Sequence, residues 1–219
     1  MNLKIINVKI LFLFFLLLFF VNTSHSQFRI GISGELASAS FGGTPPDSGS
    51  YQSIIGYGGN ALIEYKLVKD LYLSFQPGFH KRGSKIKFGD EENLINDTVI
   101  IFDVSQDCFT FPLNLKIYNN NFYVGGGVIL DVMTSANIKN ENGTLDKDIT
   151  KYFLDIDFMA DFNLGYEFTI GKPSIFIELR YTQGLININR NENFSQGDIY
   201  KANYKSSAVS FLAGIMFPL

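Results

Sequence analysis

One stretch of unbroken alternation, residues 155–168, limits the folds open to this chain more than any other feature. Strand side chains point to opposite faces in turn, so the stretch predicts one long strand with two unlike faces. A helix would scatter its carboxylates around the whole circumference. The apolar face carries Ile156, Phe158, Ala160, Phe162, Leu164, Tyr166 and Phe168. The other face carries Asp155, Asp157, Met159, Asp161, Asn163, Gly165 and Glu167.

A second strand returns from the first after a tight turn. Residues 170–173 include Gly171 and Pro173, and glycine supplies turn dihedrals while proline cannot continue a ladder. Alternation then resumes over residues 175–182. Strands of this length exceed the usual five or six residues and suit the roughly 9–11 that cross a bilayer at a tilt. The hairpin therefore predicts part of a transmembrane β-barrel.

The N-terminal residues have the pattern of an export signal. Lys4 and Lys9 precede an apolar run over residues 10–21, and Ser24 and Ser26 have the spacing of a signal-peptidase site. The apolar run is shorter than the roughly 20 residues of a spanning helix. We expect residues 1–26 to be a cleaved signal peptide and residues 27–219 to form one barrel domain.

Eight strands are expected in the exported part. The ranges with strand patterns are 28–36, 54–67, 71–80, 109–117, 122–134, 155–168, 175–182 and 208–217. The connections alternate between long and short: the long loops are 41–52, 81–97, 137–150 and 189–203, and part of 81–97 could instead extend the strand pair beyond the membrane. This order is typical of an antiparallel up-and-down barrel with both termini on one side. Alternation is irregular over residues 99–107, where we expect a bulge or a change of parity near 104–107.

Alternation alone does not say which face points inward. An outer-membrane barrel has apolar residues toward lipid, whereas a lipocalin-like carrier has an apolar interior. Small residues on the polar faces suit a narrow lumen, so we favour the membrane orientation. Buried charges must then pair, since each unpaired one costs several kcal/mol. The expected lumen charge network is Glu35, Glu64, Lys66, Lys116, Asp131, Asp157, Asp161, Glu178 and Arg180.

Composition and motifs give little sign of catalysis. The net charge is −3 and no basic run occurs, which argues against a nucleic-acid partner. The one cysteine, Cys108, excludes an intramolecular disulfide. No phosphate loop, zinc signature or nucleophile elbow is present, so no cofactor or metal is expected. A weak alternative is a barrel hydrolase in which His80 acts as a general base with Asp155 or Asp157.

Three segments resemble PorT-like outer-membrane β-barrel proteins of Bacteroidetes-type bacteria. They are Glu64-Tyr65-Lys66-Leu67 with Leu71 to Phe75 and Gln76-Pro77-Gly78-Phe79; Phe111-Pro112-Leu113 with Lys116 and Phe122 to Gly127; and Leu164-Gly165-Tyr166-Glu167 with Arg180-Tyr181 and Gly184-Leu185. The resemblance implies an eight-stranded outer-membrane barrel without a common enzymatic activity. The family's named member is linked to protein secretion.

We therefore expect a small outer-membrane barrel with an occluded polar lumen and an envelope, surface-binding or secretion-accessory role rather than catalysis. Its partners would be outer-membrane lipid and a protein or surface ligand held by the four long loops. The alternatives are a soluble lipocalin-like binder of an apolar ligand and the His80 hydrolase.

Overall fold

The computed structural model describes residues 27–46, 49–89, 100–140, 145–169, 171–190 and 202–219. The predicted signal peptide, residues 1–26, lies outside the described residues, so its cleavage stays a prediction. In the part of the chain that is described, no helix is long and apolar enough to span a membrane.

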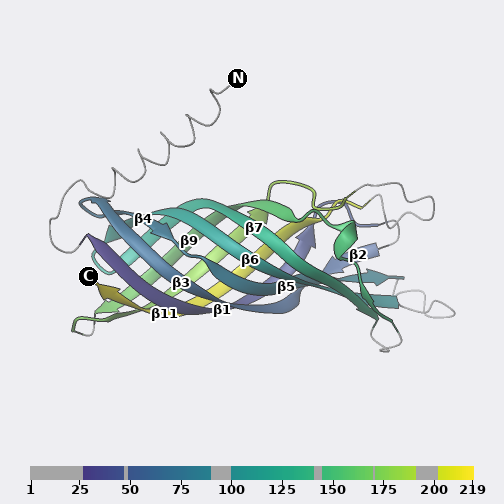
Figure 1. Cartoon of the computed structure of the whole chain (residues 1–219), viewed down its shortest axis with the longest axis horizontal. Coiled ribbons are helices and arrows are strands. Elements are labelled where there is room, and N and C mark those ends of the chain that lie inside the picture. The colour runs from purple at the N-terminus through teal and green to yellow at the C-terminus, as the bar shows by residue number, and fades with distance from the viewer. Residues whose placement is uncertain (1–26, 47–48, 90–99, 141–144, 170, 191–201) are drawn as a thin grey trace, which may run out of the picture.

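The described residues are mostly strand. In chain order, the elements are β1 (Phe28–Gly42), β2 (Gly49–Gln52), β3 (Ile54–Val68), β4 (Leu71–Phe75), β5 (Gly78–Phe88), β6 (Ile100–Asn119), β7 (Phe122–Asn140), β8 (Asp146–Asp148), the 3-10 helix η2 (Thr150–Tyr152), β9 (Ile156–Thr169), β10 (Ser174–Gly184) and β11 (Lys205–Pro218). Figure 1 shows the long strands tilted around a common axis, as expected for a barrel.

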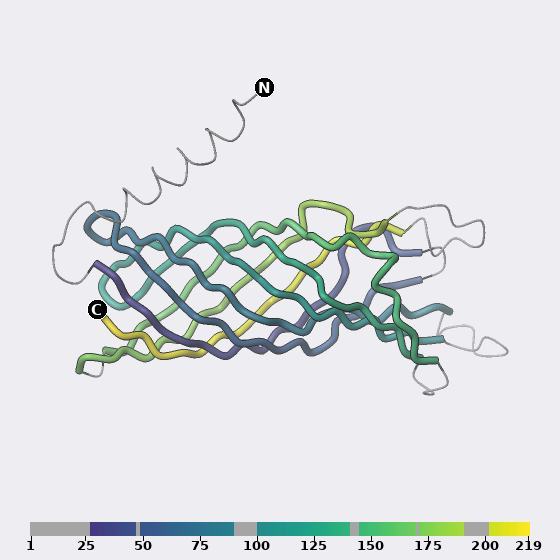
Figure 2. The backbone as a smooth tube through the Cα atoms, viewed as in Figure 1, coloured from purple at the N-terminus to yellow at the C-terminus, as the bar shows by residue number. Residues whose placement is uncertain are grey.

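The sheet closes on itself because β1 pairs with both β3 and β11. From β11 the ring continues through β10, β9, β7 and β6, and β4 and β5 complete it between β6 and β3. β4 and β5 occupy one place in the ring, so the barrel has the eight antiparallel positions that the sequence predicted. The backbone trace in Figure 2 follows this up-and-down path.

β4 and β5 are two parts of one strand that is interrupted at Gln76-Pro77. Proline has no backbone N–H, so it removes one hydrogen bond from the ladder. The Gln76 N–H still donates to the Pro112 carbonyl at 3.1 Å, and the Ala61 N–H donates to the Pro77 carbonyl at 2.9 Å. The wall therefore stays closed across the interruption.

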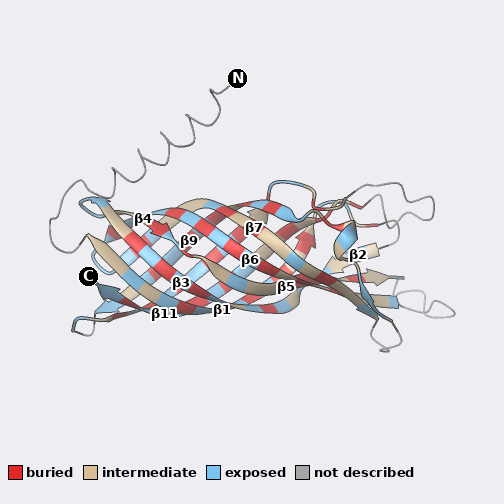
Figure 3. Ribbon diagram, viewed as in Figure 1, coloured by how far each residue is buried: buried red, intermediate tan, exposed pale blue. Residues whose placement is uncertain are grey.

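The outer face of the barrel is apolar and its interior is polar, as predicted for the membrane orientation. Phe162 is 64% exposed, whereas Arg180 is 2% exposed. Alternate residues along each strand change from buried to exposed in Figure 3. A lipocalin-like carrier requires the opposite orientation, so that alternative is wrong. Exposed apolar side chains on the outer face include Ile32, Leu36, Ile63, Phe111, Leu113, Ile156, Phe158, Leu164, Ile177, Leu179, Phe211 and Ile215.

The short connections all lie at one end of the barrel. They join β3 to β4, β6 to β7 and β9 to β10. Asp70, Asn120 and Gly171 in these turns have positive φ angles of 64°, 56° and 76°, which Asn, Asp and Gly adopt most readily. The first and last described residues lie at the same end (Figure 1). In outer-membrane barrels this is the periplasmic end, and the longer connections face outward.

The four predicted loops are partly wrong, because the strands continue beyond the expected bounds. Residues 81–88 of loop 81–97 belong to β5, and residues 137–140 and 146–148 of loop 137–150 belong to β7 and β8. Loop 41–52 likewise contributes to β1 and β2. Of loop 189–203, residues 191–201 lie outside the described residues, and Asn189 forms an isolated bridge with Phe153.

Of the two expectations for residues 104–107, the bulge is present at Asp107/Cys108 and the change of parity is wrong. Inward-facing positions of β6 alternate without interruption through Val104, Gln106 and Cys108. The extra residue lies on the neighbouring strand: Asp107 pairs with Ser135 and Cys108 with Met133, so Thr134 forms the bulge.

What changes on β6 is the polarity of the two faces. Outward positions are apolar from Phe109 onward but polar at Asp103, Ser105 and Asp107, while Val104 and Phe102 face the interior. A strand that leaves lipid for water must exchange its apolar face for a polar one. The outer ends of the strands therefore form an extension with an apolar interior, above a membrane-embedded barrel with a polar one.

Candidate functional site

The layer of the lumen nearest the short turns is centred on Lys116 of β6. The Lys116 ammonium lies 2.8 Å from Glu178 Oε2 of β10 and 3.2 Å from Glu64 Oε1 of β3. The Tyr123 hydroxyl donates to Glu178 at 2.8 Å. Both carboxylates and the ammonium are almost fully buried. The barrel thus brings together three predicted network residues from three strands.

Arg29 of β1 closes this end of the lumen. Its guanidinium pairs with Glu64, lies 2.9 Å from Glu167 Oε2, and donates to the Tyr118 hydroxyl at 2.6 Å. The same group lies over the Tyr72 ring, 4.5 Å from its centroid. The alternation of the first strand placed Arg29 on the polar face, but the expected network did not include it.

Arg180 of β10 forms the next layer. It contacts Glu178 Oε1 at 2.6 Å and Asp161 Oδ1 at 3.6 Å, and it donates to the Gln76 side chain. The Asn114 amide donates to Asp161 at 2.6 Å. Gln76, in the interruption between β4 and β5, is therefore joined to β10 across the lumen, and β6, β9 and β10 are joined to one another in the same way.

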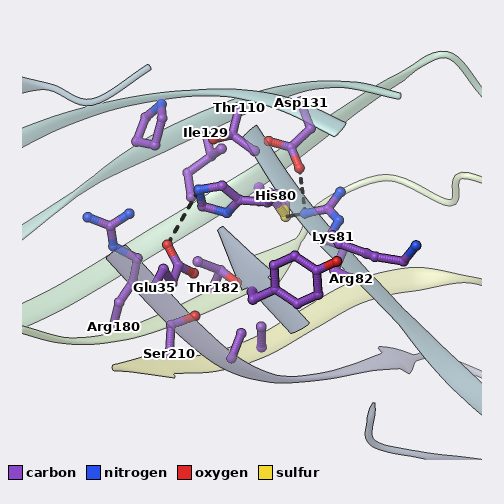
Figure 4. A pocket seen from close by; sticks show the side chains of 15 residues that line it. Glu35, His80, Lys81, Arg82, Thr110, Ile129, Asp131, Arg180, Thr182 and Ser210 are labelled. Carbon is purple, nitrogen blue, oxygen red and sulfur yellow. Dashed lines mark hydrogen bonds and ion pairs between the residues drawn. The ribbon is translucent and has the colours of Figure 1, made fainter. Parts of the chain in front are cut away.

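Above Arg180 the lumen contains a central chamber, shown in Figure 4. Arg82 of β5 lies 2.5 Å from Asp131 Oδ2 and 3.3 Å from Asp157 Oδ2. The Ser206 hydroxyl donates to Asp157 at 2.6 Å. His80 Nε2 lies 3.5 Å from Glu35 Oε2. The expected charge network did not include Arg82, because residues 81–97 were interpreted mainly as a loop. Inward Ile86 and outward lysines nevertheless alternate in these residues.

The chamber is too small for an organic substrate. Its volume is about 30 Å³, and a single water needs about 10–15 Å³ measured in the same way. A second cavity beside Phe41 and Gln106 has about 10 Å³. Side chains therefore fill the lumen and leave room for a few water molecules.

Two predicted charges lie away from this network. Lys66 is half-buried and its ammonium is 5.9 Å from the Tyr72 ring centroid. Among the described residues, no ion pair joins Lys66 to a lumen carboxylate. Asp155 precedes β9, is exposed and pairs with Arg190 at 3.3 Å.

The geometry gives no support to a His80 catalytic pair. His80 Nε2 forms a hydrogen bond with Asn60 Oδ1 at 2.8 Å, besides its contact with Glu35. Within the described residues, no hydrogen bond or ion pair joins His80 to Asp155 or Asp157. The Asp157 carboxylate is occupied by Arg82 and Ser206.

An apolar cluster closes the outer end of the lumen, and we call it the outer cap. Ring centroids of Phe41 and Tyr204 are 5.0 Å apart, and those of Phe153 and Tyr204 are 5.8 Å apart. This cluster was not predicted from the sequence, because its residues come from the ends of strands and from connections. The buried members of the outer cap are Phe41, Ile86, Val104, Ala136, Phe153, Ile188, Ala202 and Tyr204.

Polar contacts at the edge of the outer cap hold the connections in place. The Tyr51 hydroxyl donates to the Thr44 and Asn203 carbonyls, each at 3.2 Å, and burial raises the pKa of Tyr51. The Thr150 N–H donates to Asp148 Oδ1 at 2.8 Å, and hydrogen bonds from Thr150 lower the pKa of Asp148. Tyr51 thus stays protonated and Asp148 ionised at neutral pH, the states that these hydrogen bonds require.

Three features define a small outer-membrane β-barrel: an eight-stranded ring with an apolar outer face, a filled polar lumen, and short turns at the end that holds the first and last described residues. Sequence comparison gives the same class: residues 20–190 match the outer membrane protein beta-barrel domain family. The chain belongs to that family, and it is a protein of the outer membrane. No curated protein matches the chain significantly in sequence.

The solved structures that are similar to this chain are distant from it in sequence. Neisserial surface protein A is 13% identical with a TM-score of 0.47, over 90% of this chain and 99% of that one. OprG from Pseudomonas aeruginosa is 14% identical with a TM-score of 0.46, over 90% and 98% of the two chains. The Ail protein of Yersinia pestis, crystallised with the heparin analogue sucrose octasulfate, is 14% identical with a TM-score of 0.40, over 87% and 99%.

Proposed function

We propose that this protein is a sealed membrane anchor that presents a binding surface outside the cell, with an envelope or secretion-accessory role rather than catalysis. The observation that carries the proposal is the filled lumen. Arg29 and its partners occupy one end, the outer cap occupies the other, and the chamber between them holds only water-sized space. A solute does not fit through such a barrel.

The extension beyond the membrane supports the same proposal. β5, β6 and β7 continue past the apolar band, β2 and β8 pair with them, and the outer cap supplies an apolar interior. Packed strand ends of this kind hold the outer connections in fixed positions, which a binding surface requires. The surface-binding role is thus assigned to the outer connections, including those of residues 90–99 and 191–201, which lie outside the described residues.

The finer family assignment belongs to the same proposal. The three segments that resemble PorT-like barrels suggest a secretion-accessory role, with export directed by residues 1–26. The His80 hydrolase is not favoured, because His80 contacts Asn60 and Glu35 inside the lumen rather than a carboxylate at the outer rim.

Two measurements test the proposal. Liposomes that contain the refolded barrel should not swell in arabinose, whereas liposomes with a wide porin should; swelling at the porin rate would contradict a sealed anchor. Cells that display the barrel should bind specific spots on a glycan and matrix-protein array. Replacing residues 191–201 by a Gly-Ser linker should abolish that signal while heat-modifiable gel migration is retained. An array without signal would contradict the surface-binding role.

A further inference from the structure

Buried carboxylates outnumber buried cations around the central chamber. Glu35 of β1 and Asp131 of β7 line it and Asp157 of β9 lies beside it, and these residues are 8%, 1% and 5% exposed. The cation that contacts two of them is Arg82 of β5. Glu35 contacts His80, which carries a positive charge only when protonated.

The layers below the chamber do not compensate for this excess. There the three buried carboxylates Glu64, Asp161 and Glu178 contact Arg29, Lys116 and Arg180. The described part of the lumen thus holds six buried carboxylates and four buried cations; Glu167 is not counted, because it lies at the rim, is partly exposed and pairs with Arg29. Arg180 also lines the chamber, so the excess of negative charge belongs to the lumen as a whole, and within it Asp131 and Asp157 share one cation, Arg82.

Polar atoms without partners point to the same place. Thr110 Oγ1, Ser210 Oγ, Asp131 Oδ1 and Asp157 Oδ1 are buried and have no hydrogen-bond partner among the described protein atoms. Thr110 and Ser210 line the chamber together with Glu35, His80 and Asp131 (Figure 4). Buried polar groups in proteins are nearly always hydrogen-bonded, so something small and polar from solution belongs here.

We propose that the central chamber is a proton-binding site: at neutral pH the folded barrel holds at least one proton that the unfolded chain releases. An uncompensated buried charge costs several kcal/mol, and uptake of a proton removes it. The proton is shared between the carboxylates of Asp131 and Asp157, which are cross-strand neighbours and face the same guanidinium of Arg82. The other charged or titratable groups around the chamber are Glu35 of β1, His80 and Lys81 of β5, Arg180 of β10 and the Cys108 thiol of β6, while Asn60 of β3 and Thr110 of β6 are neutral.

The sign of the pH dependence follows from linkage. When the folded state binds more protons than the unfolded state, the free energy of unfolding falls as pH rises. One extra proton corresponds to an increase of up to tenfold in the unfolding equilibrium constant per pH unit. Ordinary carboxylates are ionised above pH 6 and the Cys108 thiol of the unfolded chain ionises near pH 8.5, so the response from pH 6.5 to 7.5 reports the carboxylates of the chamber.

The test is reversible urea unfolding of the refolded barrel in detergent micelles over this pH range. We expect the unfolding constant of the wild type to rise with pH, and unfolding at pH 7 in weak buffer to release at least one proton to an indicator dye. An unfolding constant that does not change with pH, with no proton released, would overturn the proposal. The wild type alone decides this point, even if a variant fails to fold.

Two matched substitutions locate the proton. Asp131→Asn removes one of the two carboxylates that face the single guanidinium of Arg82, so it should flatten the pH dependence and stabilise the barrel at pH 7.5. Glu178→Gln removes the same charge from a carboxylate that contacts Lys116 and Arg180, so it should destabilise the barrel at every pH and leave the slope unchanged. Equal responses of the two variants would contradict a site in the chamber.

A metal cation would supply the same positive charge from a different source. Replacing sodium by choline at constant pH separates the two. An unfolding constant that depends on sodium but not on pH would overturn proton binding.

Discussion

Replacing Lys116 by Met tests whether the paired charges of the lumen stabilise the barrel. The side chain is fully buried and its ammonium contacts Glu178 at 2.8 Å and Glu64 at 3.2 Å. Removing one partner of a buried ion pair costs about 3–5 kcal/mol, because it leaves an uncompensated charge. Glu178 keeps Arg180 and Glu64 keeps Arg29, so we expect the lower end of that range.

The assay is urea unfolding in micelles, followed by heat-modifiable gel migration at each urea concentration. Lys81→Met is the matched control, because Lys81 is exposed on the extension and lies 3.8 Å from Asp107. Exposed pairs contribute about 0–1 kcal/mol, so this variant should unfold almost as the wild type does. Equal losses for Lys116→Met and Lys81→Met would refute the reasoning that lumen pairing stabilises the fold.

The remaining predictions concern packing and the membrane boundary. Gly165→Ala should destabilise the barrel by about 1–3 kcal/mol, since a Cβ at this position overlaps the Tyr123 ring and the Ile177 carbonyl oxygen, whereas Gly34→Ala, whose Cβ would meet nothing within 4 Å, should not show this loss in the same unfolding assay. Phe162→Lys should cost about 2–4 kcal/mol in a bilayer, because the residue faces lipid near the middle of β9. Ser105→Lys faces outward on β6 beyond the apolar band and should change stability by less than about 0.5 kcal/mol; equal costs at the two sites would contradict the inversion of polarity.

The architecture could be predicted from the sequence because strand geometry fixes sidedness. Once residues 155–168 are a strand, Phe162 and Asp161 must lie on opposite faces, whatever the neighbouring strands do. The order of long and short connections then fixed the antiparallel path. Both inferences use local information, and both are confirmed.

The partners inside the lumen could not be predicted in the same way. Arg29 contacts Glu167 across 138 residues, and this contact depends on the tilt and stagger of the closed ring rather than on any local pattern. Lys66 shares its face with Glu64 but lies nearer the end of β3, two positions from the buried layer. Sidedness therefore predicted which residues face inward, but not their depth.

The outer extension was considered only for part of residues 81–97, and its full extent was not predicted, for a different reason. Residues 81–88 and 99–107 were compared with a membrane strand, in which outward positions must be apolar. In water the same alternation has the opposite polarity, with Ile86 and Val104 inside. When strand alternation of either polarity is considered, residues 81–88 and 99–107 also have strand patterns, and Arg82 then has an inward position.

The measurement that tests the central claim most directly is quenching of tryptophan fluorescence by brominated lipid. The sequence contains no tryptophan, so each variant reports one position. Phe162→Trp places the probe on a 64% exposed site of the outer face, and Phe176→Trp places it on a 1% exposed site of the lumen. In bilayers with brominated acyl chains, we predict strong quenching of the first variant and little quenching of the second. Strong quenching at residue 176 with none at residue 162 would show that the faces of the barrel are reversed.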